Sequence, residues 1–475
     1  MQLILRLTLL LCLAMVSTEA KPPNILFILA DDMGYGDTGF MGSKHLKTPH
    51  LDALARSGVI CSQGYVCSPV CSPSRAGLIT GRDPRRFGYE ENMNKAAPFY
   101  DTRPELLGLA PGEHTLGDHL RAAGYATALI GKWHLGTTED FHPLERGFDY
   151  FCGMLTGGHS YFPDAKKNKL ERNREPLSKF SNPYLTDFFT DEAMSWLDRQ
   201  ESKPWFLFAS YNAPHGPMQA TEADLELFGH ISDKRRRTYA AMMFALDRGV
   251  GRLRDWLKKN GQLENTLIVF FSDNGGATNN GSWNGKLSGA KGNLREGGVR
   301  VPMFWSWPGT LPSGKPYDSP ASSLDLLPTF LAAAGAKPLP LRDPMPHEDK
   351  RNFNRGVQRF GAYDGINLLP HLKGDLPPKE RTLFWRLQGQ AAVLDGDDKL
   401  IRLSHRPPQL FRPKTDLGET TDLSPSEQGR YESLFRLLGE WEASLPTVPL
   451  WGSSPYWISQ SAQHYDNMPA RPEND

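Results

Sequence analysis

The sequence has no excess of charge of either sign. Among its 475 residues, Lys and Arg together number 54, and Asp and Glu together also number 54. A balanced chain offers no general attraction for nucleic acid or for an anionic membrane surface. We therefore expect no nucleic-acid partner, and any affinity for an anionic substrate has to come from a local site.

Long apolar runs are absent beyond the N-terminus. Arg6 precedes an apolar stretch over residues 7–16, and Thr18-Glu19-Ala20 offers small residues at a cleavage position. The stretch is too short for a membrane anchor. Residues 1–20 are therefore predicted to be a signal peptide, and the mature chain is predicted to be periplasmic or secreted, with no membrane span.

Cysteine is scarce. Removal of the signal peptide would leave Cys61, Cys67, Cys71 and Cys152, too few for a disulfide scaffold in so long a chain. One interpretation is a single bridge with spare buried thiols. The other follows from the crowding of three cysteines near a Pro- and Ser-rich turn, which indicates that one of them serves chemistry. The sequence leaves the pairing of Cys61, Cys67 and Cys152 open.

Four short apolar runs predict buried strands, each ending in a polar cluster. Because continuous apolar strands occur where helices cover both faces of a sheet, they predict an α/β domain. The carboxyl ends of parallel strands meet at one edge, so the polar clusters are expected to form one shared site. The expected strands are residues 24–30, 125–130, 205–209 and 266–271, with helices at 48–57 (capped by Thr48), 115–123 and 234–260.

The chain changes character near residue 375. Four strand-like segments and one helix predict a small antiparallel sheet packed on the main domain. We expect a catalytic domain over residues 21–375 and a C-terminal subdomain with a tail over residues 376–475. The expected elements are strands at 382–387, 391–394, 399–403 and 409–412 and a helix at 426–444.

The most informative segment is Cys71-Ser-Pro-Ser-Arg75, followed by Thr80-Gly-Arg82. It resembles the signature of the type I, formylglycine-dependent sulfatases. The resemblance extends from Pro23 to about Leu423 and implies the fold of the alkaline phosphatase superfamily, with a large, mostly parallel mixed sheet between helices. Its other landmarks are Asp31-Asp32, residues 131–136, Ala213-Pro-His215, residues 272–275, Ala290-Lys291, residues 296–302 and, in the C-terminal subdomain, Gly418-Glu-Thr.

The resemblance implies that a maturation enzyme oxidises Cys71 to formylglycine. The hydrated aldehyde carries two hydroxyls. One can attack sulfur while the substrate alcohol leaves, and the other lets the sulfated diol expel sulfate by elimination. This is covalent catalysis with its own release step.

The resemblance also assigns a metal site to Asp31, Asp32, Asp273 and Asn274, with the modified side chain of Cys71 as a further ligand. Carboxylate and amide oxygens favour a hard cation, Ca²⁺ or Mg²⁺, and the family favours Ca²⁺. Taken without the rest, an Asp-Asp pair after a strand is as well explained by a helix cap.

Five basic side chains complete the implied site. Arg75 would support the formylglycine and the metal carboxylates, and Lys132 and Lys291 would bind sulfate oxygens. His134 would bond to the diol. His215 would contact substrate and protonate the leaving alkoxide, with Lys291 as a possible assistant.

Weaker candidates lie in loops. His159 and Ser160 stand where relatives present another substrate contact, although a plain Gly-rich turn explains them equally well. Arg82 is expected to brace the signature helix. Two loop segments carry residues that fit a sugar subsite, but a solvated loop is the better interpretation of both. They hold Asn279, Asn280 and Trp283, and Arg85, Arg86, Glu90, Glu91 and Asn92.

The sequence therefore predicts a sulfuric ester hydrolase acting on a sulfated oligo- or polysaccharide, since the local sequence is similar to bacterial carbohydrate sulfatases. Two alternatives stay open. One is a phosphate or phosphonate monoester hydrolase on the same fold, and the other is a non-catalytic carbohydrate-binding relative with an unmodified Cys71.

Overall fold

The computed structural model describes residues 21–93, 107–164, 166, 169–200, 203–340, 363–404 and 406–445. The predicted signal peptide and the tail from residue 446 lie outside these ranges. Across the described chain, no helix combines the length and the apolar character needed to cross a membrane.

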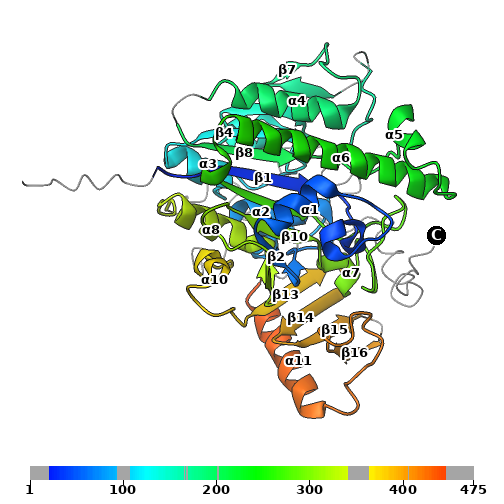
Figure 1. Cartoon of the computed structure of the whole chain (residues 1–475). Coiled ribbons are helices and arrows are strands. Elements are labelled where there is room, and N and C mark those ends of the chain that lie inside the picture. The colour runs from blue at the N-terminus through cyan, green and yellow to red at the C-terminus, as the bar shows by residue number, and fades with distance from the viewer. Residues whose placement is uncertain are drawn as a thin grey trace, which may run out of the picture.

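A ten-stranded mixed sheet forms the centre of the main domain (Figure 1). Its middle consists of four parallel neighbours, β9 (Thr266–Ser272), β1 (Asn24–Ala30), β8 (Trp205–Ser210) and β4 (Ala126–Lys132). These are the four predicted strands, and each lies within one or two residues of its expected bounds. Their carboxyl ends consequently meet at one edge.

Shorter strands extend the sheet on both sides. Beyond β4 come β5 (Tyr150–Met154), β6 (Leu170–Arg172) and β7 (Glu175–Pro176), and beyond β9 come β10 (Met303–Ser306), β2 (Val59–Cys61) and β11 (Lys315–Tyr317). The pair β3 (Gly64–Tyr65) and β12 (Ala321–Ser322) forms a separate small ladder.

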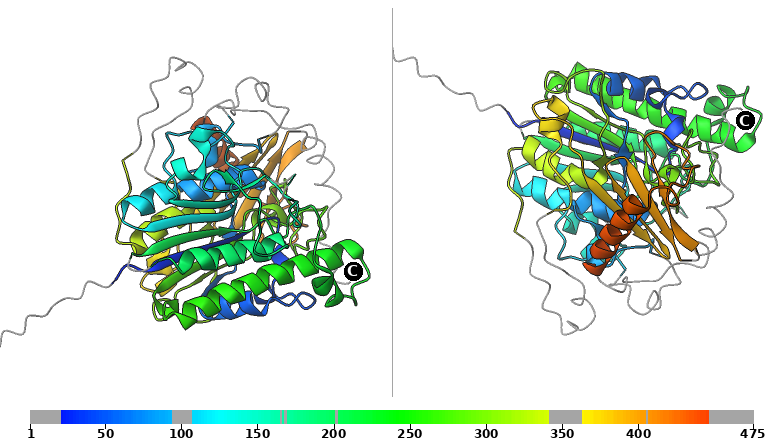
Figure 2. Two further views of the ribbon diagram at one scale, coloured as in Figure 1. Left: turned by 90° about the horizontal axis from the view of Figure 1, so that it is seen from above. Right: turned by 90° about the horizontal axis from the view of Figure 1, so that it is seen from below.

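Helices cover both faces of the sheet, which explains the unbroken apolar strands. Along β1, Leu26 and Ile28 face one core and Ile25 and Phe27 face the other. One face is covered by α1 (Pro49–Arg56), α4 (Leu185–Leu197) and α6 (Lys234–Lys259), and the other by α2 (Cys71–Thr80), α3 (Leu116–Ala122) and α8 (Leu326–Ala333) (Figures 1 and 2).

Shorter helices fill the connections. The α-helical ones are α5 (Glu222–Glu226), α7 (Glu296–Val299) and α10 (Leu369–Lys373). Single 3₁₀ turns occupy Tyr35–Asp37, Gly39–Met41, Pro84–Phe87, Glu139–Phe141, Pro143–Glu145, Leu263–Asn265 and Ser323–Asp325.

The C-terminal part forms the expected antiparallel sheet of four strands in sequential order, followed by a helix. Ala392 and Leu394 on one face of this sheet pack against Tyr65 and Val70 of the main domain. The other face packs against the helix (Figure 1). The fold class predicted from the sequence is confirmed. The elements are β13 (Thr382–Leu387), β14 (Gln390–Asp395), β15 (Asp398–Leu403), β16 (Arg406–Phe411) and α11 (Gln428–Ala443).

One local expectation, the cap of α1, was wrong. Thr48 does not cap α1, because its hydroxyl accepts from the Gly39 N–H. Asp247 of α6 takes that place and accepts from the N–H groups of His50 and Leu51. The cysteine pairing that the sequence left open is also resolved: all the cysteines in the described chain are buried free thiols, so the interpretation with a single bridge does not hold.

Candidate active site

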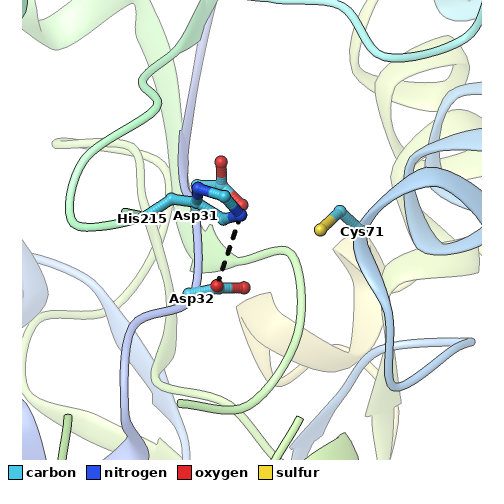
Figure 3. A group of neighbouring side chains, drawn as sticks. All are labelled: Asp31, Asp32, Cys71 and His215. Carbon is cyan, nitrogen blue, oxygen red and sulfur yellow. Dashed lines mark ion pairs between the residues drawn. The ribbon is translucent and has the colours of Figure 1, made fainter. Parts of the chain in front are cut away.

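The ends of the four central strands bring the polar clusters together. Asp31 and Asp32 follow β1, Lys132 ends β4, and His215 lies in the loop after β8. Cys71 reaches the same place from the start of α2 (Figure 3). Atoms of Asp31, Asp32, Cys71 and His215 that could bind a metal ion all lie within 4.8 Å of one another.

Cys71 is held at the buried first turn of α2. Its side chain is only 2% exposed, and its Sγ lies 3.1 Å from the Nζ of Lys291. The next residue, Ser72, donates its hydroxyl to the carbonyl of His134 and so ties α2 to the end of β4. Burial raises the pKa of the Cys71 thiol to about 11, although Lys132 and Lys291 oppose the rise. The unmodified thiol is therefore a poor nucleophile at neutral pH.

Arg75, one turn further along α2, connects three strand ends. Its Nε donates to Asp273 at 2.9 Å, and its Nη1 donates to the Lys132 carbonyl and to the Ser210 hydroxyl. Its Nη2 is buried without a hydrogen-bond partner, 4.0 Å from Asp31. The rigid guanidinium thus holds the Asp273 carboxylate by a hydrogen bond and places its positive charge beside Asp31.

Two lysines pair with the two aspartates that follow β1. Lys132 Nζ lies 2.6 Å from Asp31 Oδ2, and Lys291 Nζ lies 2.6 Å from Asp32 Oδ1. Burial would raise the pKa of Asp32, but Lys291 and His215 lower it below its ordinary value. Burial would lower the pKa of Lys291, but Asp32 and Cys71 raise it well above its ordinary value. Both groups are therefore charged at neutral pH.

The carboxylates and the amide leave acceptor atoms that fit a cation. Asp31 Oδ1 and Asn274 Oδ1 are buried and receive no hydrogen bond. A buried acceptor without a donor costs about 1–3 kcal/mol, and a hard cation would satisfy both oxygens. Asn274 donates to Asp32 at 2.7 Å, and Asp273 accepts from the Asp32 N–H. The four predicted ligands thus belong to one cluster.

His215 lies at the rim of this cluster, with its Nε2 3.7 Å from Asp32 Oδ2 (dashed line in Figure 3). Its Nδ1 lies 2.7 Å from the Gly216 carbonyl, which only accepts, so Nδ1 carries a proton. Burial, together with Lys132 and Lys291, lowers the pKa of His215 to about 4 against the opposing effect of Asp32. The neutral ring consequently presents an unprotonated Nε2 to the site.

His134 is buried at the end of β4 with a positive φ of 63°. Its Nδ1 has no hydrogen-bond partner. A Cβ on Gly157 would lie 2.6 Å from His134 Nε2, so the ring fits only because that residue is glycine. Burial and the nearby Lys132 lower the pKa of His134 well below its ordinary value, and the ring is neutral.

The weaker candidates His159 and Ser160 lie outside the carboxylate cluster. His159 uses both ring nitrogens locally, on the Ser160 carbonyl and the Lys169 N–H. The Ser160 hydroxyl donates to Gln219. His159 and Ser160 thus make their hydrogen bonds to nearby loop residues. Within the described residues, neither contacts the carboxylate cluster.

The interpretation of two loops as solvated was wrong for several members. Asn280 is 1% exposed and donates to the carbonyls of Asp32 and Pro214. Buried backbone carbonyls require such donors. Arg85 and Glu90 are likewise buried, and Glu90 pairs with Arg386 of the C-terminal subdomain.

Two residues were missed. Ser210 links Arg75 to the Lys132 carbonyl, and the Tyr161 hydroxyl donates to the carbonyls of Asn212 and His215. Neither residue is charged or part of a recognised motif. The only signals in the sequence were the position of Ser210 at the end of a predicted strand and that of Tyr161 just after the Gly-Gly turn.

Comparison with known proteins agrees with the signature. Residues 23–336 match the family model described as Sulfatase. The chain belongs to the sulfatase family. N-acetylgalactosamine-6-sulfatase of Sus scrofa is 33% identical over 389 residues, which cover 78% of this chain and 69% of that protein. The chain is therefore an enzyme that hydrolyses sulfate esters.

Solved structures resemble most of the chain. The structure of Ps i-CgsB in complex with k-i-k-neocarrahexaose is 36% identical, with a TM-score of 0.81, and the match covers 94% of this chain and 98% of that one. Phosphonate monoester hydrolase of Agrobacterium radiobacter shares the fold at 19% identity, with a TM-score of 0.59 over 89% of this chain and 95% of that one.

Proposed function

We propose that this sulfatase is exported and removes sulfate from a sulfated carbohydrate, with formylglycine at position 71 and bound Ca²⁺. The observation that carries the mechanism is the position of Cys71. Its Sγ lies against Lys291, beside the buried carboxylates of Asp31 and Asp32. Residue 71 is thus the only group of the described cluster that family chemistry converts into a nucleophile.

The charges in the cluster suit an anion once a metal ion is bound. Three carboxylates (Asp31, Asp32 and Asp273) face three cations (Arg75, Lys132 and Lys291). A divalent cation held by the predicted ligands would leave an excess of two positive charges. The metal would supply Lewis-acid stabilisation of charge on a sulfate oxygen. The two lysines, already buried and charged, would bind other sulfate oxygens without reorganisation.

The rest of the chemistry falls to residues of the chain. When residue 71 is formylglycine, its hydrated aldehyde supplies one hydroxyl for attack on sulfur and a second for release of sulfate. Arg75 holds the carboxylates in place. Lys291, 3.1 Å from the sulfur of Cys71, is placed to stabilise negative charge on the side chain that replaces the thiol.

A proton for the leaving alcohol comes from His215 or Lys291. Burial lowers the pKa of His215 to about 4, which favours the neutral ring, so an acid role requires a second proton on Nε2. A bound sulfate ester would favour that proton because it places negative charge beside the ring. Lys291, whose pKa lies well above its ordinary value, already carries a proton that it could donate. The response of His215→Ala to the leaving group distinguishes the two donors.

The substrate class rests on the relatives. Ps i-CgsB was solved with neocarrahexaose, and the chain matches it over almost its full length. The curated relatives include N-acetylgalactosamine-6-sulfatases. Both names point to sulfate carried on a sugar, and we propose an oligosaccharide sulfate as the substrate.

The test uses full-length protein made together with a formylglycine-generating enzyme. Sulfate release is measured on sulfated neocarra-oligosaccharides, N-acetylgalactosamine 6-sulfate and an aryl sulfate. We expect release from at least one sugar, whereas hydrolysis of the aryl ester alone would overturn the carbohydrate assignment. Peptide mass spectrometry across residue 71 should show the aldehyde, and a persistent thiol in active protein would overturn the nucleophile.

Matched sulfate and phosphate esters of one alcohol test the alternative reaction. A larger kcat/KM for the phosphate ester would make this chain a phosphatase on the sulfatase scaffold.

Export is tested by determining the N-terminal residue of the secreted or periplasmic protein, which we expect near residue 21. An intact residue 1 in cytoplasmic protein would refute it.

A further inference from the structure

Lys291 is delivered by a loop, residues 288–296, rather than by a strand. Its N–H donates to the Gly276 carbonyl, and the next N–H, of Gly292, donates to the carbonyl of Pro69 near Cys71. The loop is closed at its base, where the Gly297 N–H donates to the Ser288 carbonyl at 2.7 Å. The position of the lysine therefore depends on how the two ends of this loop are held.

Glu419 of the C-terminal subdomain holds both ends with one oxygen. Its Oε2 accepts from the Ser288 hydroxyl at 2.9 Å and from the Glu296 N–H at 2.8 Å. The Glu419 carbonyl accepts from Arg295 at 2.8 Å. The side chain is 2% exposed, and its backbone φ is 49°. Glu419 is the glutamate of the Gly418-Glu-Thr motif, which is not part of the carboxylate cluster at Cys71.

Lys399 of β15 joins Glu419 to a second carboxylate. Its Nζ lies 2.7 Å from Glu296 Oε1 and 3.2 Å from Glu419 Oε1, with all three side chains buried. The other oxygen of Glu296 accepts from the Tyr65 hydroxyl at 2.8 Å. Tyr65 belongs to the segment that leads into α2 and Cys71. One buried charge cluster thus joins the subdomain to both segments that form the nucleophile site.

A further contact reaches the lysine more directly. Gln390, at the start of β14, donates to the Gly292 carbonyl at 3.0 Å. Gly292 is the neighbour of Lys291, so the subdomain supports the loop beside the lysine as well as at its base.

We propose that Glu419 is a positioning residue for Lys291, and that the C-terminal subdomain sets the distance between Lys291 and residue 71. Buried ionic groups contribute little net stability compared with apolar ones, so we attribute to this cluster a role in fixing one geometry. The inference rests on the proposed function because it assigns Lys291 to catalysis. A displacement of a catalytic group by about 1 Å can cost about 100-fold in rate.

The test is a double-mutant cycle of Glu419→Ala with Lys291→Ala, using kcat on an aryl sulfate. We expect Glu419→Ala to lower kcat at least about tenfold in the parent enzyme and less than about twofold in the Lys291→Ala background. Equal losses in both backgrounds would overturn the proposal, because they indicate a general structural effect. Glu442→Ala is the matched control. It breaks the Arg402–Glu442 pair of the same subdomain and should leave kcat unchanged.

Ser288→Ala is a milder test in case Glu419→Ala fails to fold, because it removes only the hydroxyl that donates to Glu419. We expect a few-fold loss of kcat with an unchanged KM. Hydrogen exchange, followed by mass spectrometry, supplies a readout without catalysis. Residues 288–296 should exchange faster in Glu419→Ala, with no change in the α4 and α6 peptides. Unchanged exchange in the loop would overturn positioning even if no sulfate ester proved to be a substrate.

Discussion

Arg75 donates to Asp273 across 2.9 Å, with both side chains fully buried. Arg75→Lys keeps the charge but loses the planar fork that also reaches Ser210 and the Lys132 carbonyl. We expect a loss of kcat/KM of at least about 100-fold and of about 3 kcal/mol in the free energy of unfolding. Steady-state kinetics and denaturant unfolding measure these two quantities.

Arg82→Lys is the control for that variant. Arg82 follows the same helix and pairs with Glu113 at 2.6 Å, away from the carboxylate cluster. It should lower stability while changing kcat/KM by no more than a few-fold. Full activity in Arg75→Lys would show that the fork is not needed.

Cys71→Ala should abolish turnover and leave the fold intact. Alanine removes the atom that becomes the nucleophile, and it suits the first turn of a helix. The melting temperature and the circular dichroism spectrum should match those of the parent. Residual turnover above the background of an unrelated protein prepared in the same way would contradict the nucleophile assignment.

His215→Ala should impair alkyl sulfates more than activated aryl sulfates, because a phenolate with a low pKa needs no proton to leave. The ratio of kcat/KM for the two ester types, compared between parent and variant, measures the effect. Equal losses would remove His215 from the acid role and leave Lys291 as the donor.

Removal of the metal should inactivate the enzyme reversibly. A chelator selective for Ca²⁺ would leave the Asp31 and Asn274 oxygens without a partner, so activity and melting temperature should both fall. Added Ca²⁺ should restore them. Asn274→Ala should weaken Ca²⁺ binding and so raise the Ca²⁺ concentration needed for activity. Recovery with Mg²⁺ but not Ca²⁺ would contradict the identity of the ion.

Asp247 predicts a pH dependence of stability. Burial raises its pKa from 3.8 to about 6, against the opposing N–H bonds of Leu51 and His50. A raised carboxyl pKa favours the folded state at low pH, and that contribution is lost as the pH rises through about 6. Between about pH 4 and pH 8, Asp247→Asn should therefore gain up to about 3 kcal/mol relative to the parent.

Denaturant unfolding of both proteins at several pH values measures the difference in the free energy of unfolding, and the subtraction cancels the titration of groups that both proteins share. Asparagine keeps an acceptor oxygen for the N-terminus of α1. A difference that does not vary with pH would show that Asp247 has an ordinary pKa.

The sequence sufficed for the parts of the fold that local patterns determine. The buried strands were readable because apolar runs such as residues 266–271 end at polar clusters, and the C-terminal strands were readable from their turns. The cap of α1 was not, because the Asp247 carboxylate comes from a distant helix. Asn280 was misjudged for the same reason, since its partners at Asp32 and Pro214 are adjacent only in space.

The candidate site was predictable through the signature segment, which contains Cys71 and Arg75. The arrangement of the side chains around that segment was not predictable. Nothing local to Glu419 indicates that it meets Ser288 and Glu296, because that contact depends on the docking of one sheet against another. Pairwise positions of buried charges follow from tertiary packing rather than from composition.

The burial of α2 has a consequence for the proposed oxidation of Cys71. Every residue of this helix is enclosed, and the groups around Cys71 come from segments that follow it by as many as 220 residues. An enzyme that must grip Cys71 and its neighbours cannot reach them once those later segments have closed over the helix. The oxidation of Cys71 proposed above would therefore have to take place between synthesis of the signature segment and completion of the sheet, and a chain that folded first would keep an unmodified thiol.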